Sequence, residues 1–269
     1  MSTALRLLGA AAVFAGLCLG SACRKESVEI IRIKPTSFTA EDEAAIGRRL
    51  ASESWRNENV AVIEPDRGEF TDGVYHFLRP LVRGLVAQPA VTRRDSFEWE
   101  VHVVLDREPH AYTLPGGQIV LHTGLLRGIS SEAECVGILA REIALAESGA
   151  AMAALDRQVD DNVTLGDMIL GNLVPLDHII EALPQLAYTA EEMRVADSLA
   201  AELVCPSDYE ERGLPMAVGK FEGEVMYNIA RPAEPAWTSR FEARVAECPG
   251  ADSLYARRYR RMLSAHVPR

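Results

Sequence analysis

The sequence predicts an α+β fold that is mostly helical and contains one small sheet. Two capping boxes, in which Ser131 is followed by Glu134 and Thr189 by Glu192, mark the starts of amphipathic helices. Between the helical segments, Phe97–Leu105 largely alternates apolar and polar side chains, which is typical of a half-buried strand. Because helices and strands do not alternate regularly along the chain, α+β is favoured over a parallel α/β fold.

The composition is that of a globular protein. The chain has 269 residues, of which 48% are hydrophobic, enough for one large domain or two small ones. This apolar fraction excludes intrinsic disorder, and five cysteines are too few for a disulfide scaffold. The 39 acidic residues outnumber 28 Lys and Arg residues, giving a formal charge of −11. An acidic chain binds polyphosphates poorly, so we expect no nucleic-acid partner.

The N-terminus has the pattern of an export signal. Residues 1–22 contain the positive Arg6, an apolar stretch over Leu7–Leu19 and small residues before Cys23. This order resembles a bacterial lipoprotein signal, in which the new N-terminal cysteine is acylated. We therefore expect a signal peptide over residues 1–22 and a lipidated tether over residues 23–38. The tether would anchor the protein to a membrane of the bacterial cell envelope, on the periplasmic side and preferentially at the outer membrane. Ordinary cleavage after Ala22 is the alternative.

The first half of the expected domain contains two helices and two strands. Thr39 caps a helix from about Ala40 to Trp55, and apolar residues three and four apart predict a second helix over Val74–Leu85. The strand Phe97–Leu105 follows. Leu114-Pro115-Gly116-Gly117 breaks the chain before a second short strand, Gln118–Leu121.

The second half is predicted to be helical with interruptions. Ser131 and Thr189 open helices, and helical pieces are expected at Leu165–Leu173 and Leu176–Leu183. The sequence after Pro206 reads as irregular, and an Arg-rich helix is expected over residues 254–264. Among the cysteines, Cys205 and Cys248 flank loop-like sequence and are able to pair in an oxidising compartment. Cys135 lies inside a helical pattern and is expected to be buried.

Leu114-Pro115-Gly116-Gly117 is followed by Gly124-Leu125-Leu126 and then by Ser131-Glu132-Ala133-Glu134. In this order and spacing, the motifs resemble metallopeptidase family forty-eight, the HtpX-like and CAAX-prenyl-protease-like zinc endopeptidases. A later helix, residues 188–204, is similar to its E-x-x-x-D motif, and residues 231–247 resemble its His-Pro-Pro-x-x-x-Arg ending. The resemblance implies a zincin-like domain over residues 39–250, in which the small sheet lies between the N-terminal helices and the active-site helix. A helical tail over 251–269 follows.

The same resemblance places the catalytic HExxH motif at Arg141–Leu145. Zinc needs two histidines one helical turn apart, but a guanidinium has no lone pair to donate and Leu145 has no donor atom. Met193 stands where the family has its third ligand, and a thioether suits soft ions such as Cu(I) instead of hydrolytic zinc. We therefore expect no metal cofactor. Only the general-base position survives, as Glu142, with Asp197 in the supporting position, and a carboxylate without zinc cannot activate water.

We hypothesise that Arg141 replaces the lost dication. A site lined by Glu142 and Asp197 would otherwise hold unbalanced negative charge, which is costly when buried. In this hypothesis Arg141 bridges both carboxylates, while Leu145 and Met193 close the cavity by apolar packing. The alternative is that Arg141 points into solvent.

The glycine loop has two interpretations that the sequence does not separate. In the resembled family, the strand after this loop is an edge strand that receives substrate, which implies a peptide-binding edge at Gly116, Gly117 and Gln118. Alternatively, the glycines only satisfy the backbone geometry of a turn.

Three functions are compatible with these observations. The favoured one is an envelope lipoprotein whose metallopeptidase-like domain is a pseudopeptidase, binding a peptide or envelope protein without cleaving it. The second is an active zinc-dependent endopeptidase with displaced ligands, for instance His110 or His122. The third is a purely structural envelope protein. Apart from the peptide or protein partner, the expected partner is the membrane, through the lipid anchor.

Overall fold

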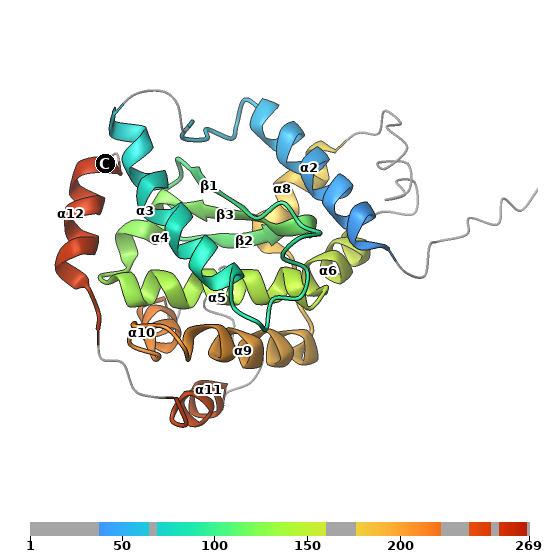
Figure 1. The fold of residues 1–269 in the computed structure, drawn as a ribbon. Coiled ribbons are helices and arrows are strands. Elements are labelled where there is room, and N and C mark those ends of the chain that lie inside the picture. The colour runs from blue at the N-terminus through green and yellow to red at the C-terminus, as the bar shows by residue number, and fades with distance from the viewer. Residues whose placement is uncertain (1–37, 65–68, 160–175, 222–236, 249–252, 268–269) are drawn as a thin grey trace, which may run out of the picture. The chain divides into compact units, whose positions relative to one another are not determined.

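The computed structural model describes residues 38–64, 69–159, 176–221, 237–248 and 253–267 (Figure 1). The predicted signal peptide, the tether before Phe38 and the helical piece Leu165–Leu173 lie outside these residues. Within the described ranges, no helix combines the length and the apolar character needed to cross a bilayer.

A three-stranded sheet lies at the centre of the fold. Its strands are β1 (Glu100–Val104), β2 (Ala111–Leu114) and β3 (Gln118–His122), in the order β1-β3-β2. β3 pairs in parallel with β1 and antiparallel with β2. The predictions of β1 and β3 are confirmed, although β1 begins at Glu100 instead of Phe97. β2 was not predicted, because all four of its residues are buried and its sequence therefore shows no alternation.

Helices surround this sheet and account for most of the described residues, which confirms the α+β prediction (Figure 1). They are α2 (Ala40–Arg56), α3 (Glu69–Val86), α4 (Thr123–Gly128), α5 (Glu132–Glu147), α6 (Ala150–Gln158), α8 (Asp177–Ala182), α9 (Ala190–Val204), α10 (Gly213–Lys220), α11 (Trp237–Val245) and α12 (Ala256–His266), with short 3₁₀ turns at Pro115–Gly117 and Leu183–Gln185.

The two faces of the sheet belong to two separate apolar clusters. Val101, Val103 and Ile119 point to a cluster shared with α3, α5 and α9. Strand residues that point to the opposite face, such as Val104 and Val120, belong to a second cluster shared with α2, α6 and α8. This division follows from the alternation of side chains along a strand. It places α5 against one face of the sheet, with α9 on the far side of α5 (Figure 1).

α2 begins as the sequence predicts and lies directly against the glycine loop. The Thr39 hydroxyl and the Asp42 carboxylate cap each other's backbone N–H groups in a complete capping box. At Gly47 the helix approaches the Pro115 carbonyl so closely that an added Cβ would lie 1.8 Å from its oxygen. Gly116 has a φ of 75° and faces the Ala44 backbone. Glycine is therefore required on both sides of this contact.

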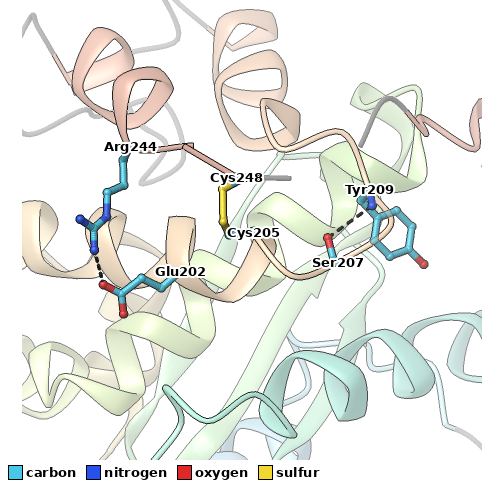
Figure 2. Close-up of a disulfide and its surroundings, with 6 residues drawn as sticks. All are labelled: Glu202, Cys205, Ser207, Tyr209, Arg244 and Cys248. Atoms are coloured by element: carbon cyan, nitrogen blue, oxygen red, sulfur yellow. Dashed lines mark hydrogen bonds and ion pairs between the residues drawn. A yellow bond between two sulfur atoms is a disulfide. The ribbon is translucent and has the colours of Figure 1, made fainter. Parts of the chain in front are cut away.

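The region after Pro206 corrects the sequence analysis, because it contains α10 and α11 where irregular structure was expected. These helices have only 8 and 9 residues, so packing stabilises them more than intrinsic propensity does. A disulfide joins Cys205, which follows α9, to Cys248, which follows α11 (Figure 2). Beside it, Arg244 and Glu202 form an ion pair at 2.5 Å between the same two helices. Cys135 is buried, as predicted.

The predicted C-terminal helix is present as α12 and packs against α3 and α5. Arg258 pairs with Glu132, a carboxylate in the first turn of α5 that is only 1% exposed. The Tyr259 hydroxyl donates to the Leu126 carbonyl at 2.6 Å. α12 therefore holds the beginning of α5 in place.

Candidate functional site

α5 carries the candidate site and is buried along its whole length. Its N-terminus is fixed by polar contacts that differ from the predicted capping box. The Ser131 hydroxyl accepts from the Glu134 N–H, but the Glu134 carboxylate accepts from the Ser130 N–H instead of the Ser131 N–H. Lys220 of α10 lies 2.5 Å from the same carboxylate. Negative side chains at this end of α5 are also favoured by the helix dipole.

Arg141 points into the protein, between α5, α9 and α11. Its side chain is 3% exposed, and its Nε donates to Oδ1 of Asp197 at 2.8 Å. The guanidinium carbon lies 5.0 Å from the centre of the Trp237 ring on α11, a cation–π distance. The alternative that Arg141 points into solvent is therefore wrong, and the predicted pairing with Asp197 is confirmed.

Glu142 does not share this ion pair, which corrects the hypothesis that Arg141 bridges both carboxylates. Although the two residues are adjacent in sequence, no ion pair within 4.0 Å joins them. Consecutive side chains on a helix point in directions about 100° apart, so one arginine cannot easily serve both acids. Burial raises the pKa of Glu142 to about 8, against a smaller lowering of the pKa by Arg141. Glu142 is therefore largely neutral at pH 7.

Tyr188 is a site residue that the sequence analysis missed. Its hydroxyl is buried and finds no hydrogen-bond partner among the described residues. Burial raises its pKa strongly, and the next largest contribution comes from Glu142, so the phenol lies within electrostatic range of that carboxylate. The only sequence signal was its position directly before the Thr189 cap. Trp237 was missed as well, because its contact with Arg141 joins residues far apart in the chain.

Leu145 and Met193, which the sequence analysis assigned to the other two ligand positions, have buried apolar side chains. They are 2% and 5% exposed and belong to the same apolar cluster as Ala196 and Ala200 of α9. Together with Arg141, they present a guanidinium, an alkyl group and a thioether, which do not fit a hydrolytic zinc ion. Among the residues that the structure describes, no group of three or more His, Cys, Asp or Glu side chains is arranged to hold a metal.

His110 and His122, the alternative ligands, meet each other at the ends of β2 and β3. Their ring centres are 5.1 Å apart, and Nδ1 of His122 lies 3.7 Å from Oδ2 of Asp106. Burial, and next the neighbouring His110, lower the pKa of His122 to about 4. Neither histidine forms a hydrogen bond or ion pair with Glu142 in the described structure.

The substrate-binding edge expected at Gly116, Gly117 and Gln118 is not an edge of the sheet. Gln118 begins β3, the central strand, which pairs on both sides. Its side-chain amide is also engaged, donating to the Glu98 carbonyl at 2.7 Å and contacting Nε2 of His102 at 2.8 Å. The sheet's outer strands are β1 and β2. Every residue of β2 is buried, at 5% exposure or less.

Comparisons with known proteins identify the family. A model of peptidase family M48 matches residues 78–243, which is more than half of the chain. The mitochondrial metalloendopeptidase OMA1 of Schizosaccharomyces pombe is 32% identical over 93 residues, covering 34% of this chain and 28% of that protein. OMA1 of Saccharomyces cerevisiae is 26% identical over 106 residues, covering 38% and 30%. The chain thus spans less than a third of the length of these relatives. With its zincin-like α+β fold, the chain belongs to peptidase family M48.

Proposed function

We propose that this chain is a non-catalytic member of its family, a pseudopeptidase that binds a peptide or an envelope protein without cleaving it. The observation that carries the proposal is the buried ion pair between Arg141 and Asp197. It places a permanent positive charge on the helix where the family's motif has a zinc-binding histidine.

Electrostatics argue against a metal beside this ion pair. An arginine side chain stays protonated at any ordinary pH, so it would repel a dication while competing with it for Asp197. Glu142, which occupies the general-base position, is largely neutral because its pKa is about 8. Bound zinc would lower the pKa of a water molecule from about 15.7 to about 7, and a mostly protonated carboxyl group supplies no comparable activation.

The cellular setting in this proposal rests on the sequence. The apolar stretch before Cys23 and the positive Arg6 support export, and the cysteine at the cleavage point supports acylation. The protein would then act from the periplasmic face of a bacterial envelope membrane. Mass spectrometry of the mature protein tests this part: an acylated Cys23 at the new N-terminus is expected, and a chain cleaved elsewhere would overturn it.

The catalytic part of the proposal is tested by restoring the ligands. Arg141→His, Leu145→His and Met193→Glu together recreate the family's donor set around Glu142. We expect the native protein to bind zinc substoichiometrically and the triple variant to bind about one ion, as measured by elemental analysis after gel filtration. A second triple variant that also carries Glu142→Gln is the control for hydrolysis of a casein substrate. Tightly held zinc and chelator-sensitive proteolysis in the native protein would overturn the proposal.

A further inference from the structure

The free side of β1 is only partly covered. Residues 61–63 run antiparallel to its C-terminal end, with Leu105 N–H donating to the Ala61 carbonyl at 2.7 Å and Ile63 N–H donating to the Val103 carbonyl at 2.8 Å. At Val103 this pairing ends. The Val103 N–H donates instead to the Tyr75 hydroxyl at 3.1 Å, and that hydroxyl donates to the Ile63 carbonyl.

Beyond this point no described segment pairs with the outer edge of β1, where Val101 is 4% exposed. Backbone groups alternate in direction along a strand, so Val101 has the orientation of Val103, with its N–H and C=O facing away from β3. No described residue outside the sheet forms a hydrogen bond with either group of Val101. The indole N–H of Trp99, two residues earlier, is also buried and has no acceptor in the described structure. Three polar groups therefore lack partners along this edge.

The edge lies in a cavity with a volume of about 1060 Å³. Ligand pockets are typically of roughly 300–1,000 Å³, so the space is ample for a peptide segment. One wall is α3, with Tyr75, Arg79 and Arg83. The opposite wall contains Trp55, at the end of α2, and Val60. A groove between two walls at an open sheet edge is the geometry of strand addition.

The α3 wall carries uncompensated positive charge. His76, Arg79 and Arg83 are three and four residues apart and exposed on one face of the helix. Arg79 lies over the Tyr75 ring, 5.1 Å from its centre, and neither arginine forms an ion pair with a described residue. The acids of the cavity, Glu64 and Glu100, lie on its other walls, and Oε2 of Glu100 is 3.7 Å from Nε2 of His102. Two arginines without a carboxylate partner among the described residues favour a negatively charged ligand.

We propose that this groove binds an extended acidic peptide of a partner protein, which adds to β1 as an antiparallel strand continuing the line of residues 61–63. Opposed residues of antiparallel strands share a face, so the peptide residue that pairs with Val101 points its side chain to α3. Acidic side chains at alternate positions meet Arg79 and Arg83, and the apolar side chains between them meet Trp55 and Val60. This deepens the proposed binding function but does not depend on the loss of catalysis, because the groove shares no residue with the Arg141 site.

The first test uses a fluorescent peptide of about ten residues that alternates glutamate with valine, and its lysine–valine counterpart, with the purified full-length protein. We expect the acidic peptide to bind and the basic one to bind at least tenfold more weakly, by fluorescence anisotropy. N-methylation at the glutamates removes the N–H groups directed at β1 and is expected to abolish binding. N-methylation at the valines is expected to be tolerated. Equal effects of the two modifications, or the reverse pattern, would overturn the proposal.

The second test reverses the charge of the α3 wall. The double variant Arg79→Glu, Arg83→Glu changes exposed residues and is expected to weaken binding of the acidic peptide about tenfold or more. Arg260→Glu, on the exposed side of α12, is the matched control and is expected to leave binding unchanged. Unchanged affinity in the double variant would overturn the proposal.

Two other occupants are distinguished by the same variants. If anionic vesicles bind to this protein through Arg79 and Arg83 while no acidic peptide does, the groove is a membrane contact and the proposal is wrong. If the protein forms a dimer that the double variant dissociates, as seen by sedimentation, the occupant is a second copy and the proposal is equally wrong. Failure of these tests leaves the zinc-reconstitution result untouched.

Discussion

The Nε atom of Arg141 and the Oδ1 atom of Asp197 lie 2.8 Å apart and join α5 to α9. Both residues are buried. The two opposite charges therefore compensate each other in the protein interior.

Removing one partner of this pair is expected to cost far more than removing both. Arg141→Met leaves Asp197 buried and uncompensated, and a loss of about 3–5 kcal/mol in the free energy of unfolding is expected. The double variant Arg141→Met, Asp197→Leu is expected to recover most of that loss. Urea denaturation measures all three proteins. Arg56→Met, at an ion pair in which Arg56 is 73% exposed, is the control and is expected to change stability little. Additive effects of the two buried substitutions would contradict this account.

Glu142 is expected to make the protein less stable as the pH rises. The unfolded chain releases the proton of this carboxyl near its ordinary pKa of 4.5, whereas the folded protein keeps it until about pH 8. Between these values the folded state binds more protons, so the free energy of unfolding falls with increasing pH, by up to about 1.4 kcal/mol per unit from this group. Glu142→Gln cannot ionise. Its unfolding free energy, measured from pH 5 to 8, is expected to lack that part of the slope, and parallel curves for the two proteins would contradict the assignment.

A side chain added in the glycine loop is expected to destabilise the protein. Gly116→Ala forces a φ of 75° on an L-residue and places a Cβ 2.4 Å from the Ala44 Cα. Backbone strain and overpacking together predict a loss of about 2–4 kcal/mol. The matched control is Gly84→Ala in α3, where an added Cβ meets nothing within 4 Å and a slight gain is expected. Thermal denaturation compares the two variants. Similar unfolding midpoints would contradict the close contact between α2 and this loop.

The disulfide is expected to stabilise the packing of α11 on α9. Cys205 and Cys248 are 43 residues apart, and a loop of this length predicts a contribution of about 3–4 kcal/mol. Cys205→Ser with Cys248→Ser should lose that amount in urea denaturation and become insensitive to reductant. Cys135→Ala provides the contrast, since its buried thiol takes no part in the disulfide and its variant should keep the reductant sensitivity. If reductant leaves the stability of the native protein unchanged, the prediction is wrong.

The elements that the sequence predicted well are those whose order is local. The Thr39 and Thr189 caps and the apolar periodicity that follows each of them lie within a few residues, so α2 and α9 were predicted close to their observed starts. β2 was not predicted because its four buried residues give no periodic signal. α10 and α11 were not predicted because they are too short to show one.

At the candidate site, the sequence indicated which residues take part but not where their side chains point. It predicted that Arg141 pairs with Asp197 and that Leu145 and Met193 are packed among apolar residues, and the structure confirms both points. It could not show that Glu142 faces elsewhere, because adjacent residues look equivalent in a motif but diverge around a helix. Trp237 and Tyr188 come from other segments, and only tertiary packing reveals that they approach Arg141 and Glu142.

The pairing of Arg258 with Glu132 also bears on how the protein matures. α5 precedes α12 in the chain, so the carboxylate at the head of α5 is synthesised before the arginine that pairs with it. Until α12 is synthesised, that carboxylate lacks its arginine partner. Final packing of the head of α5 therefore depends on the segment that carries Arg258, and chains shortened before α12 lack this cation.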